Sequence, residues 1–385
     1  MVVKMNFSKM EKFLDWLVTW RIPGVDCIVI KDGETVFRHM AGYADIEAGR
    51  EMRGDEIYNM WSCSKPITCA AAMTLYERGD FLLTDPLERY MPEFSEMKIR
   101  IKQEDGTSVL VPAKKKILVR DLFSMSAGFD YDIESEPIKA VKKATDGRCP
   151  TVETVKAIAK CPLYFEPGTH WLYSLCHDIL AGFVEVVSGE RFSDYVKHAI
   201  FEPLGMTDST FAAPEQRLLD RMSRQYSFNF DTNKAIPTDN SVTHRLGTEY
   251  ESGGAGLICS LEDYAKFAYA MANGGVGANG ARILSRRTID LMRTNIMNED
   301  QMKDVNWEQL AGYGYGLGVR TMVSPGAGGS NGPVGEFGWA GAAGSYVMID
   351  PENRLALVYG EHMLNSMETY ITPRLRNMLY AALED

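Results

Sequence analysis

Apolar residues recur at helical spacing at the beginning of the chain. Between residues 7 and 20 they stand three or four positions apart, which predicts an amphipathic helix. An apolar, β-branched run at 25–30 then predicts a strand, and Asp32-Gly33 is a typical hairpin turn before a second strand-like run at 35–41. The chain is therefore predicted to begin with a helix and a β-hairpin.

The middle of the chain has mostly helical spacing. An Ala-, Met- and Leu-rich stretch at 65–78 is followed by Gly79, a typical helix stop. Ser260-Leu-Glu-Asp263 resembles a capping box and predicts a helix from there to Ala272. Four further helices are predicted between Pro- and Gly-containing loops, at residues 120–126, 151–160, 177–187 and 192–200.

Short strand-like runs return near the end, at residues 313–319, 345–349 and 355–359, before a last helical stretch at 367–383. Strands at both ends and helices between them predict a sheet domain built from both termini, with a helical region inserted. We expect residues 1–58 and 250–385 to form the α/β sheet domain and residues 59–249 a mainly helical domain.

The composition narrows the classes of partner. The 385 residues have ordinary globular proportions, 45% hydrophobic and 24% charged. A net charge of −11 argues against nucleic acid or an anionic membrane as the partner. The sequence has neither a signal-peptide pattern at its start nor a long uncharged apolar window, so we expect a cytoplasmic protein.

Cysteine and histidine patterns argue against disulfides and metals. The seven cysteines are odd in number and include no CxxC pair, which favours reduced, mostly buried thiols. The six histidines form no HExxH or HxH motif, so the sequence supports no metal site, and we expect no cofactor. The oligomeric state is not indicated by the sequence.

The sharpest candidate for chemistry is the pair Ser62 and Lys65. The i, i+3 spacing at the beginning of a predicted helix places both side chains on one face, where the helix N-terminus adds a positive potential. A serine hydroxyl is a poor nucleophile until a base takes its proton, and a desolvated lysine can serve or assist as that base. A Ser N-cap beside a surface lysine is the structural alternative. A thiol nucleophile at Cys63 would need a paired histidine, which the sequence does not supply.

Two later features could complete such a site. Tyr173 lies between a Pro-Gly turn and a predicted helix, and its phenol, with an ordinary pKa of about 10, would act as a base only beside a cation. The Gly- and Ala-rich stretch around Trp339 and Gly341 would let a strand approach a ligand closely and present an N–H to an oxyanion. The structural alternatives are a tyrosine buried in the core for the first feature and a glycine-rich strand at a bend for the second.

A rival serine lies in residues 328–332, which fit G-x-S-x-G around Ser330. In α/β-hydrolases this motif joins a strand to a following helix. Here Ser324-Pro-Gly-Ala precedes it, and Pro333-Val-Gly follows it, which predicts a loop instead. We therefore do not expect Ser330 to be catalytic.

In this order the three features resemble the serine β-lactamase and penicillin-binding-protein superfamily. The sequence is most similar to the class C β-lactamase-like branch and, within it, to the family VIII carboxylesterases. The resemblance implies an α+β, β-lactamase-like fold with an antiparallel sheet, flanking terminal helices, a mostly helical inserted domain, and the active site in the cleft between them. It is carried by residues 61–66, 118–128, 165–182, 201–211, 252–263 and 335–351.

The resemblance also implies a role for each residue. Ser62 would be the acylated nucleophile, and Lys65 and Tyr173 would transfer its proton. The backbone N–H groups of Ser62 and Ala342 would form the oxyanion hole. From the residues themselves, Trp61 and Trp339 are candidates for an apolar acyl pocket, with ordinary core residues as the alternative, and Gly341 is a candidate substrate-binding residue.

Two departures bear on the substrate. Leu175 stands where class C β-lactamases have the Asn of Tyr-x-Asn, and Trp339 stands where they have the Lys of Lys-Thr-Gly. An amide and a cation are thereby lost, so we expect a more apolar cleft. Both changes match the esterase branch, which also has an Asp five residues after the Tyr, here Asp178.

The favoured prediction is a serine hydrolase that works through an acyl-enzyme on Ser62 and hydrolyses short-chain esters. The alternatives are an amide hydrolase, namely a β-lactamase, D-amino-acid peptidase or amidase, and a non-catalytic binding protein of the same fold. In each case we expect the partner to be a small molecule.

Overall fold

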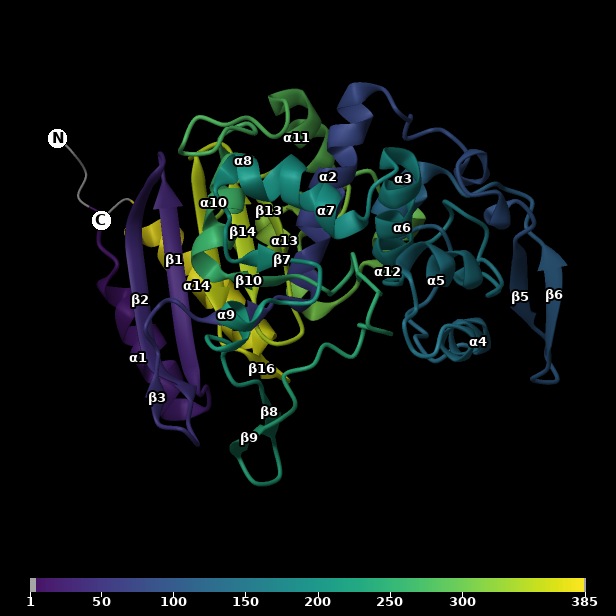
Figure 1. The fold of residues 1–385 in the computed structure, drawn as a ribbon. Helices are drawn as coiled ribbons and strands as arrows, with labels where there is room; N and C mark the ends of the chain where they lie inside the picture. The colour runs from purple at the N-terminus through teal and green to yellow at the C-terminus, as the bar shows by residue number, and fades with distance from the viewer. Residues whose placement is uncertain (1–4, 384–385) are drawn as a thin grey trace.

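An antiparallel sheet forms the centre of the computed structural model, which describes residues 5–383 (Figure 1). Its eight strands come from both ends of the sequence, as predicted, and every neighbouring pair is antiparallel. In spatial order they are β11 (Tyr313–Tyr315), β12 (Arg320–Met322), β13 (Phe337–Ala340), β14 (Tyr346–Asp350), β15 (Leu355–Gly360), β1 (Gly24–Lys31), β2 (Glu34–Asp45) and β3 (Arg50–Glu51).

The two faces of the sheet pack against different helices. Side chains alternate along a strand, so Cys27 and Val29 of β1 enter one core while Ile28 enters the other. Helices α1 (Ser8–Trp20) and α14 (Glu368–Ala382) share the first core, and α10 (Leu261–Ala272) packs in the second. The Ser260 side chain caps α10 by accepting a hydrogen bond from the Asp263 N–H, so that predicted helix beginning is confirmed.

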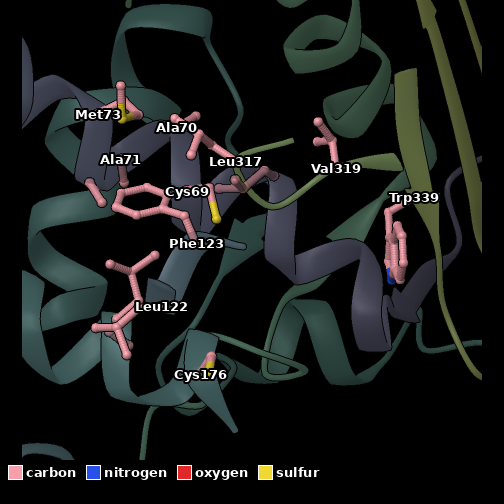
Figure 2. Packing of buried hydrophobic residues seen from close by; sticks show 14 of the residues in the cluster. Cys69, Ala70, Ala71, Met73, Leu122, Phe123, Cys176, Leu317, Val319 and Trp339 are labelled. Atoms are coloured by element: carbon pink, nitrogen blue, oxygen red, sulfur yellow. The ribbon is translucent and has the colours of Figure 1, made fainter. Parts of the chain in front are cut away.

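Helix α2 (Ser64–Arg78) runs through the second core. Every residue from Ser64 to Met73 is buried, as expected of a helix enclosed by protein. It packs against α6 (Cys176–Ser188) and ends at Gly79, whose φ of 80° is the left-handed conformation that glycine favours. Figure 2 shows part of this core, in which the Phe123 ring lies near Cys69 and Ala71 of α2.

Of the remaining helices in the described residues, three follow the predicted stretches at 120–126, 151–160 and 192–200, whereas the other six were not predicted from the sequence. The helix predicted at 192–200 ends early because the backbone changes to π-helical hydrogen bonding over Lys197–Phe201. The strand predicted at 313–319 is interrupted by a turn in which the Gly316 N–H bonds to the Val319 carbonyl. The helices are α3 (Val119–Phe123), α4 (Glu136–Ala144), α5 (Thr151–Ile158), α7 (Phe192–Val196), α8 (Glu202–Leu204), α9 (Gln216–Leu219), α11 (Arg286–Met292), α12 (Glu299–Asp304) and α13 (Pro325–Gly328).

Three small sheets complete the described fold, and all three consist of strands that the sequence did not indicate. The hairpin of β5 (Lys98–Lys102) and β6 (Ser108–Pro112) projects from the helical side of the molecule (Figure 1). The others are β4 (Ile57–Asn59) with β10 (Ile258–Ser260) and β7 (Ser209–Thr210), and β8 (Tyr226–Asn229) with β9 (Lys234–Pro237) and β16 (Met363–Leu364). The parallel β8–β16 pair joins the middle of the chain to its end. The division into residues 1–58 plus 250–385 and 59–249 stays a prediction.

The seven cysteines are all within the described residues and are free thiols, six of them buried. Within residues 5–383, no helix combines the length and apolar character needed to cross a membrane.

Candidate active site

Ser62 lies in a tight turn between β4 and α2. The preceding residue, Trp61, has a φ of 48°, a conformation that large side chains adopt only when their surroundings hold them there. The Trp61 Nε1–H donates to Gln225 Oε1 at 3.1 Å, and the Met60 N–H bonds to the Leu257 carbonyl at 2.9 Å. Trp61 is buried while Ser62 is partly exposed, so the turn presents the serine to the surface of the site.

Lys65 and Tyr173 both reach the Ser62 hydroxyl. Lys65 Nζ lies 3.1 Å from Ser62 Oγ, and the Tyr173 hydroxyl lies 2.5 Å from the same atom. Lys65 Nζ also lies 4.5 Å from the centre of the Tyr173 ring. The cation that a catalytic phenol requires is therefore beside Tyr173, and Ser62 has two groups within proton-transfer distance.

Two further groups hold the lysine, and the sequence analysis identified neither. The Lys65 ammonium donates to the Tyr131 hydroxyl at 3.1 Å and to the Gly254 carbonyl at 2.7 Å. With Ser62 Oγ these acceptors match the three N–H donors of a lysine. Burial, with a smaller contribution from Tyr173, raises the pKa of Tyr131 well above its ordinary value. Tyr131 therefore stays protonated and orients Lys65.

Asp178 positions the loop that contains Gly254. Its Oδ1 atom accepts hydrogen bonds from Ser252 Oγ at 2.6 Å and from the Tyr250 hydroxyl at 3.0 Å. A Cβ atom at Gly254 would lie 2.5 Å from Asp178 Oδ2, so only glycine fits between this carboxylate and Lys65. Asp178 thus acts on Lys65 through the loop rather than by contact.

The two candidate oxyanion donors are held close together by the turn after β13. The Gly341 N–H bonds to the Ser345 carbonyl at 2.7 Å, and Ser345 Oγ donates to the Met60 carbonyl at 2.8 Å, two residues before Ser62. Within residues 5–383, the backbone N–H groups of Ser62 and Ala342 donate to no other group. Unpaired N–H groups beside a nucleophile are what an oxyanion hole requires.

Ser62 opens into a cavity of about 180 Å³. Of the residues predicted to form the site, Ser62, Tyr173, Trp339, Gly341 and Ala342 line it. Its walls near Ser62 are aromatic, because the Tyr173 and Trp339 rings stack at 5.8 Å and Trp307 meets Tyr173 edge-on at 5.1 Å.

Two of the predicted substrate-binding residues lie outside this cavity. Leu175 is buried in the core and precedes α6, where its carbonyl accepts from the Asp178 and Ile179 N–H groups. Trp61 packs into a separate small cluster with Val242, Ala255 and Ala343. The structure thus brings together Ser62, Lys65 and Tyr173, the three predicted catalytic residues, with the later strand, but places Leu175 and Trp61 outside the cavity.

The cavity is not apolar throughout, which corrects the expectation drawn from Trp339. That residue does replace a cation on β13, but Arg320 of β12, and Glu368 and Arg376 of α14 line the same cavity. The positive charge that the strand lost is present on neighbouring elements, which a motif comparison along one strand could not show.

Comparison with known proteins agrees with this geometry. The beta-lactamase family profile matches residues 10–382. The chain belongs to the beta-lactamase family. Members of this family are serine hydrolases, and the superfamily and fold expected from the motifs are confirmed.

Individual relatives cover most of the chain. It is 30% identical to Protein Rv1367c of Mycobacterium tuberculosis over 332 residues, which cover 83% of this chain and 80% of the relative. It is 28% identical to Esterase EstB of Burkholderia gladioli over 381 residues, 94% of this chain and 91% of EstB. The solved structure of EstCE1, described as a hydrolase with promiscuous acyltransferase activity, matches with a TM-score of 0.76 at 23% identity over 98% of each chain, which shows a common fold.

The rival groups of this beta-lactamase family member are poorly placed for catalysis. Ser330 follows the single helical turn α13 and precedes β13, the reverse of the strand-to-helix context that its motif requires. Burial raises the pKa of the Cys63 thiol to about 12, which disfavours a thiolate nucleophile. Burial also lowers the pKa of His177 to about 3, and its Nε2 lies 3.0 Å from the Phe123 carbonyl. The described part of the chain brings together no His, Cys, Asp or Glu group able to hold a metal ion.

Proposed function

We propose that this protein is a carboxylesterase that hydrolyses short-chain esters through an acyl-enzyme on Ser62. One observation carries the proposal: Ser62 Oγ lies 3.1 Å from Lys65 Nζ and 2.5 Å from the Tyr173 hydroxyl at a cavity. In the first step Ser62 Oγ attacks the ester carbonyl while the Tyr173–Lys65 pair takes its proton and passes it to the departing alkoxide.

The later steps use the same groups. The N–H groups of Ser62 and Ala342 stabilise the oxyanion formed in each tetrahedral intermediate. Water then attacks the acyl-enzyme, the Tyr173–Lys65 pair removes its proton, and the proton returns to Ser62 Oγ as the acid leaves. Each turnover therefore consumes one ester and one water and releases one alcohol and one acid.

Two considerations favour esters. The aromatic rings of Tyr173, Trp307 and Trp339 form an apolar wall that suits the acyl chain of a short ester, and EstB is named an esterase. Arg320 and Arg376 favour the second candidate, a β-lactamase or D-amino-acid peptidase, because their guanidinium groups could pair with the carboxylate of such a substrate. A non-catalytic binding protein would have no need for the Ser62, Lys65 and Tyr173 arrangement.

The test is hydrolysis of p-nitrophenyl acetate and butyrate, with nitrocefin, benzylpenicillin and a D-Ala-D-Ala peptide in the same panel. We expect ester hydrolysis with a burst of one p-nitrophenol per chain, and loss of essentially all activity in Ser62→Ala. Ser330→Ala is the matched control and should retain wild-type rates. Hydrolysis of the lactam or peptide in preference to both esters would support the second candidate instead.

A further inference from the structure

Two arginines in the cavity wall have no part in the reaction just described. Arg320 and Arg376 are each only 4% exposed, and both line the cavity that begins at Ser62. A guanidinium group remains protonated at any pH at which a protein is folded. The wall formed by β12 and α14 therefore contains two buried positive charges.

One buried carboxylate balances one of these charges. Glu336 is fully buried, and its Oε1 lies 3.4 Å from Arg320 Nη2. Its other oxygen, Oε2, accepts a hydrogen bond from the Tyr313 hydroxyl at 2.5 Å. Arg320 Nη2 also donates to the Val347 carbonyl at 3.0 Å, so Arg320 is held in place by an ion pair and a backbone bond.

Arg376 lacks such a partner. Its Nη1 donates to the neutral Tyr313 hydroxyl at 2.6 Å, and its Nε–H has no hydrogen-bond acceptor. Within residues 5–383 no carboxylate lies within ion-pair distance of it. The Tyr346 hydroxyl, which belongs to the same wall, is likewise buried without a partner. Buried charges and polar groups are stable only when they are paired, so this wall is built for a ligand that supplies an acceptor.

We propose that the arginine wall, defined as Arg320, Tyr346 and Arg376, binds a carboxylate of the substrate, so that the preferred substrates are small esters with a second, free carboxylate. This inference rests on the proposed esterase function and names its substrate class. Arginine suits the role because its planar guanidinium matches the two oxygens of a carboxylate. Ser62 and the wall line the same cavity of about 180 Å³, so one small molecule can contact both.

Glu368 lines the same cavity. Burial raises the pKa of its carboxyl above the ordinary value, against the weaker opposing effect of Arg320. This shift reduces the tendency of Glu368 to ionise beside a bound carboxylate.

The experiment compares acidic esters with neutral partners of similar size. One arm has the carboxylate on the acyl side, mono-p-nitrophenyl adipate against p-nitrophenyl hexanoate. The other has it on the alcohol side, 4-acetoxybenzoate against its methyl ester. We expect the acidic ester to exceed its neutral partner in kcat/KM by roughly tenfold in one arm, mainly through KM, as a charge-assisted hydrogen bond implies. The arm that shows the preference identifies the side of the ester that meets the wall.

Variants on α14 provide the matched comparison. Arg376→Gln should reduce the acid-to-neutral ratio to near one. Arg374→Gln should leave the ratio unchanged, because Arg374 is exposed and stacks on the Tyr370 ring at 3.6 Å, outside the cavity. Should Arg376→Gln fail to fold, inhibition of the wild-type enzyme by adipate and by adipamide decides, and adipate should inhibit at concentrations at least about tenfold lower.

The failures of the two proposals are distinguishable. Hydrolysis of neutral esters without an acid preference in either arm, and equal inhibition by adipate and adipamide, would overturn the arginine wall and leave the esterase standing. Absence of any ester hydrolysis would overturn the esterase. Calorimetry with adipate would then still test the arginine wall. We expect adipate to bind to the wild type and to Arg374→Gln but not to Arg376→Gln. Absence of adipate binding to the wild type would refute the arginine wall.

Discussion

The two ends of the Ser62 cavity differ in how their polar groups are paired. At the reactive end each N–H of Lys65 has an acceptor, namely Ser62, Tyr131 and Gly254. At the arginine wall the Arg376 Nε–H and the Tyr346 hydroxyl have none. The three paired donors of Lys65 fix its ammonium group in one geometry before the substrate arrives, and we call this the saturated end. An unsaturated buried cation instead keeps its binding capacity for the substrate.

The largest expected loss of activity comes from substitutions at the saturated end. Lys65→Ala and Tyr173→Phe should each lower kcat by roughly 10² or more, because each removes one half of the proton-transfer pair. The double variant should lose little beyond either single variant, since residues that act as a unit are not additive. Steady-state kinetics with p-nitrophenyl butyrate measure this. Near wild-type turnover by Tyr173→Phe would show that the phenol does not carry the proton.

Substrate choice should show the next largest effect. Benzylpenicillin carries a side-chain amide N–H that an ester lacks, and this group costs about 1–3 kcal/mol if the aromatic wall leaves it unpaired. We therefore expect kcat/KM for p-nitrophenyl butyrate to exceed that for benzylpenicillin by at least about tenfold. The lost cation alone no longer argues against the lactam, because Arg320 and Arg376 line the cavity. Equal or better hydrolysis of benzylpenicillin would favour the β-lactamase alternative.

A smaller effect on kcat should come from Asp178, which positions the loop that holds Lys65 but does not contact Lys65 itself. Asp178→Ala leaves the Ser252 and Tyr250 hydroxyls without an acceptor and frees the loop that holds Lys65 through Gly254. We expect kcat to fall by about tenfold with little change in KM, and the pH dependence of kcat to shift, because the setting of Lys65 changes. Asp178→Asn retains an acceptor oxygen and should recover most of the rate. If both variants lost only thermal stability, Asp178 would be purely structural.

The fold and the proximity of Ser62, Lys65 and Tyr173 could be predicted from the sequence. The i, i+3 spacing of Ser62 and Lys65 is a local signal, although Ser62 lies in the turn before α2 rather than in the helix itself, and the helix stop at Gly79 is a residue-level signal. Tyr173 lies 111 positions from Ser62, so its place beside the serine followed from the resemblance and from its order along the chain. The catalytic roles of the three residues stay predictions.

The other parts of the cavity depend on residues brought together from distant positions. Tyr131 and Gly254 lie 66 and 189 positions from Lys65, and neither belongs to a motif with recognised chemistry. Arg376 meets Tyr313 across 63 positions, and a buried arginine cannot be distinguished from a surface one by its neighbours in sequence. Leu175 was expected in the cleft by its motif position, but the approach to α6 buries it instead.

The last prediction concerns Glu361, whose titration should change the stability of the protein and have the smallest effect on catalysis. Glu361 is buried and lines a narrow gap together with Glu368. Burial raises the pKa of Glu361 to about 8. The Tyr359 hydroxyl donates a hydrogen bond to Glu361 Oε2 at 2.6 Å. Because the unfolded pKa is about 4.3, the folded state holds more protons between the two values. This group therefore makes the free energy of unfolding fall as pH rises from about 4.3 to about 8.

Glu361→Gln removes that titration. The free energy of unfolding of the variant, relative to the wild type, should rise by several kcal/mol between pH 5 and pH 8. Urea unfolding of both proteins at the two pH values measures the difference and cancels the other titrating groups. A difference that does not change with pH would mean that Glu361 is ionised in the folded protein.

The identity of the acylated residue tests the central claim most directly. The wild-type protein is treated with a fluorophosphonate, or with p-nitrophenyl butyrate and an acid quench, and the adduct is located by peptide mass spectrometry. We predict one adduct per chain on Ser62, with none formed by Ser62→Ala and full labelling of Ser330→Ala. An adduct on Ser330 or Cys63, or labelling that persists in Ser62→Ala, would contradict the account.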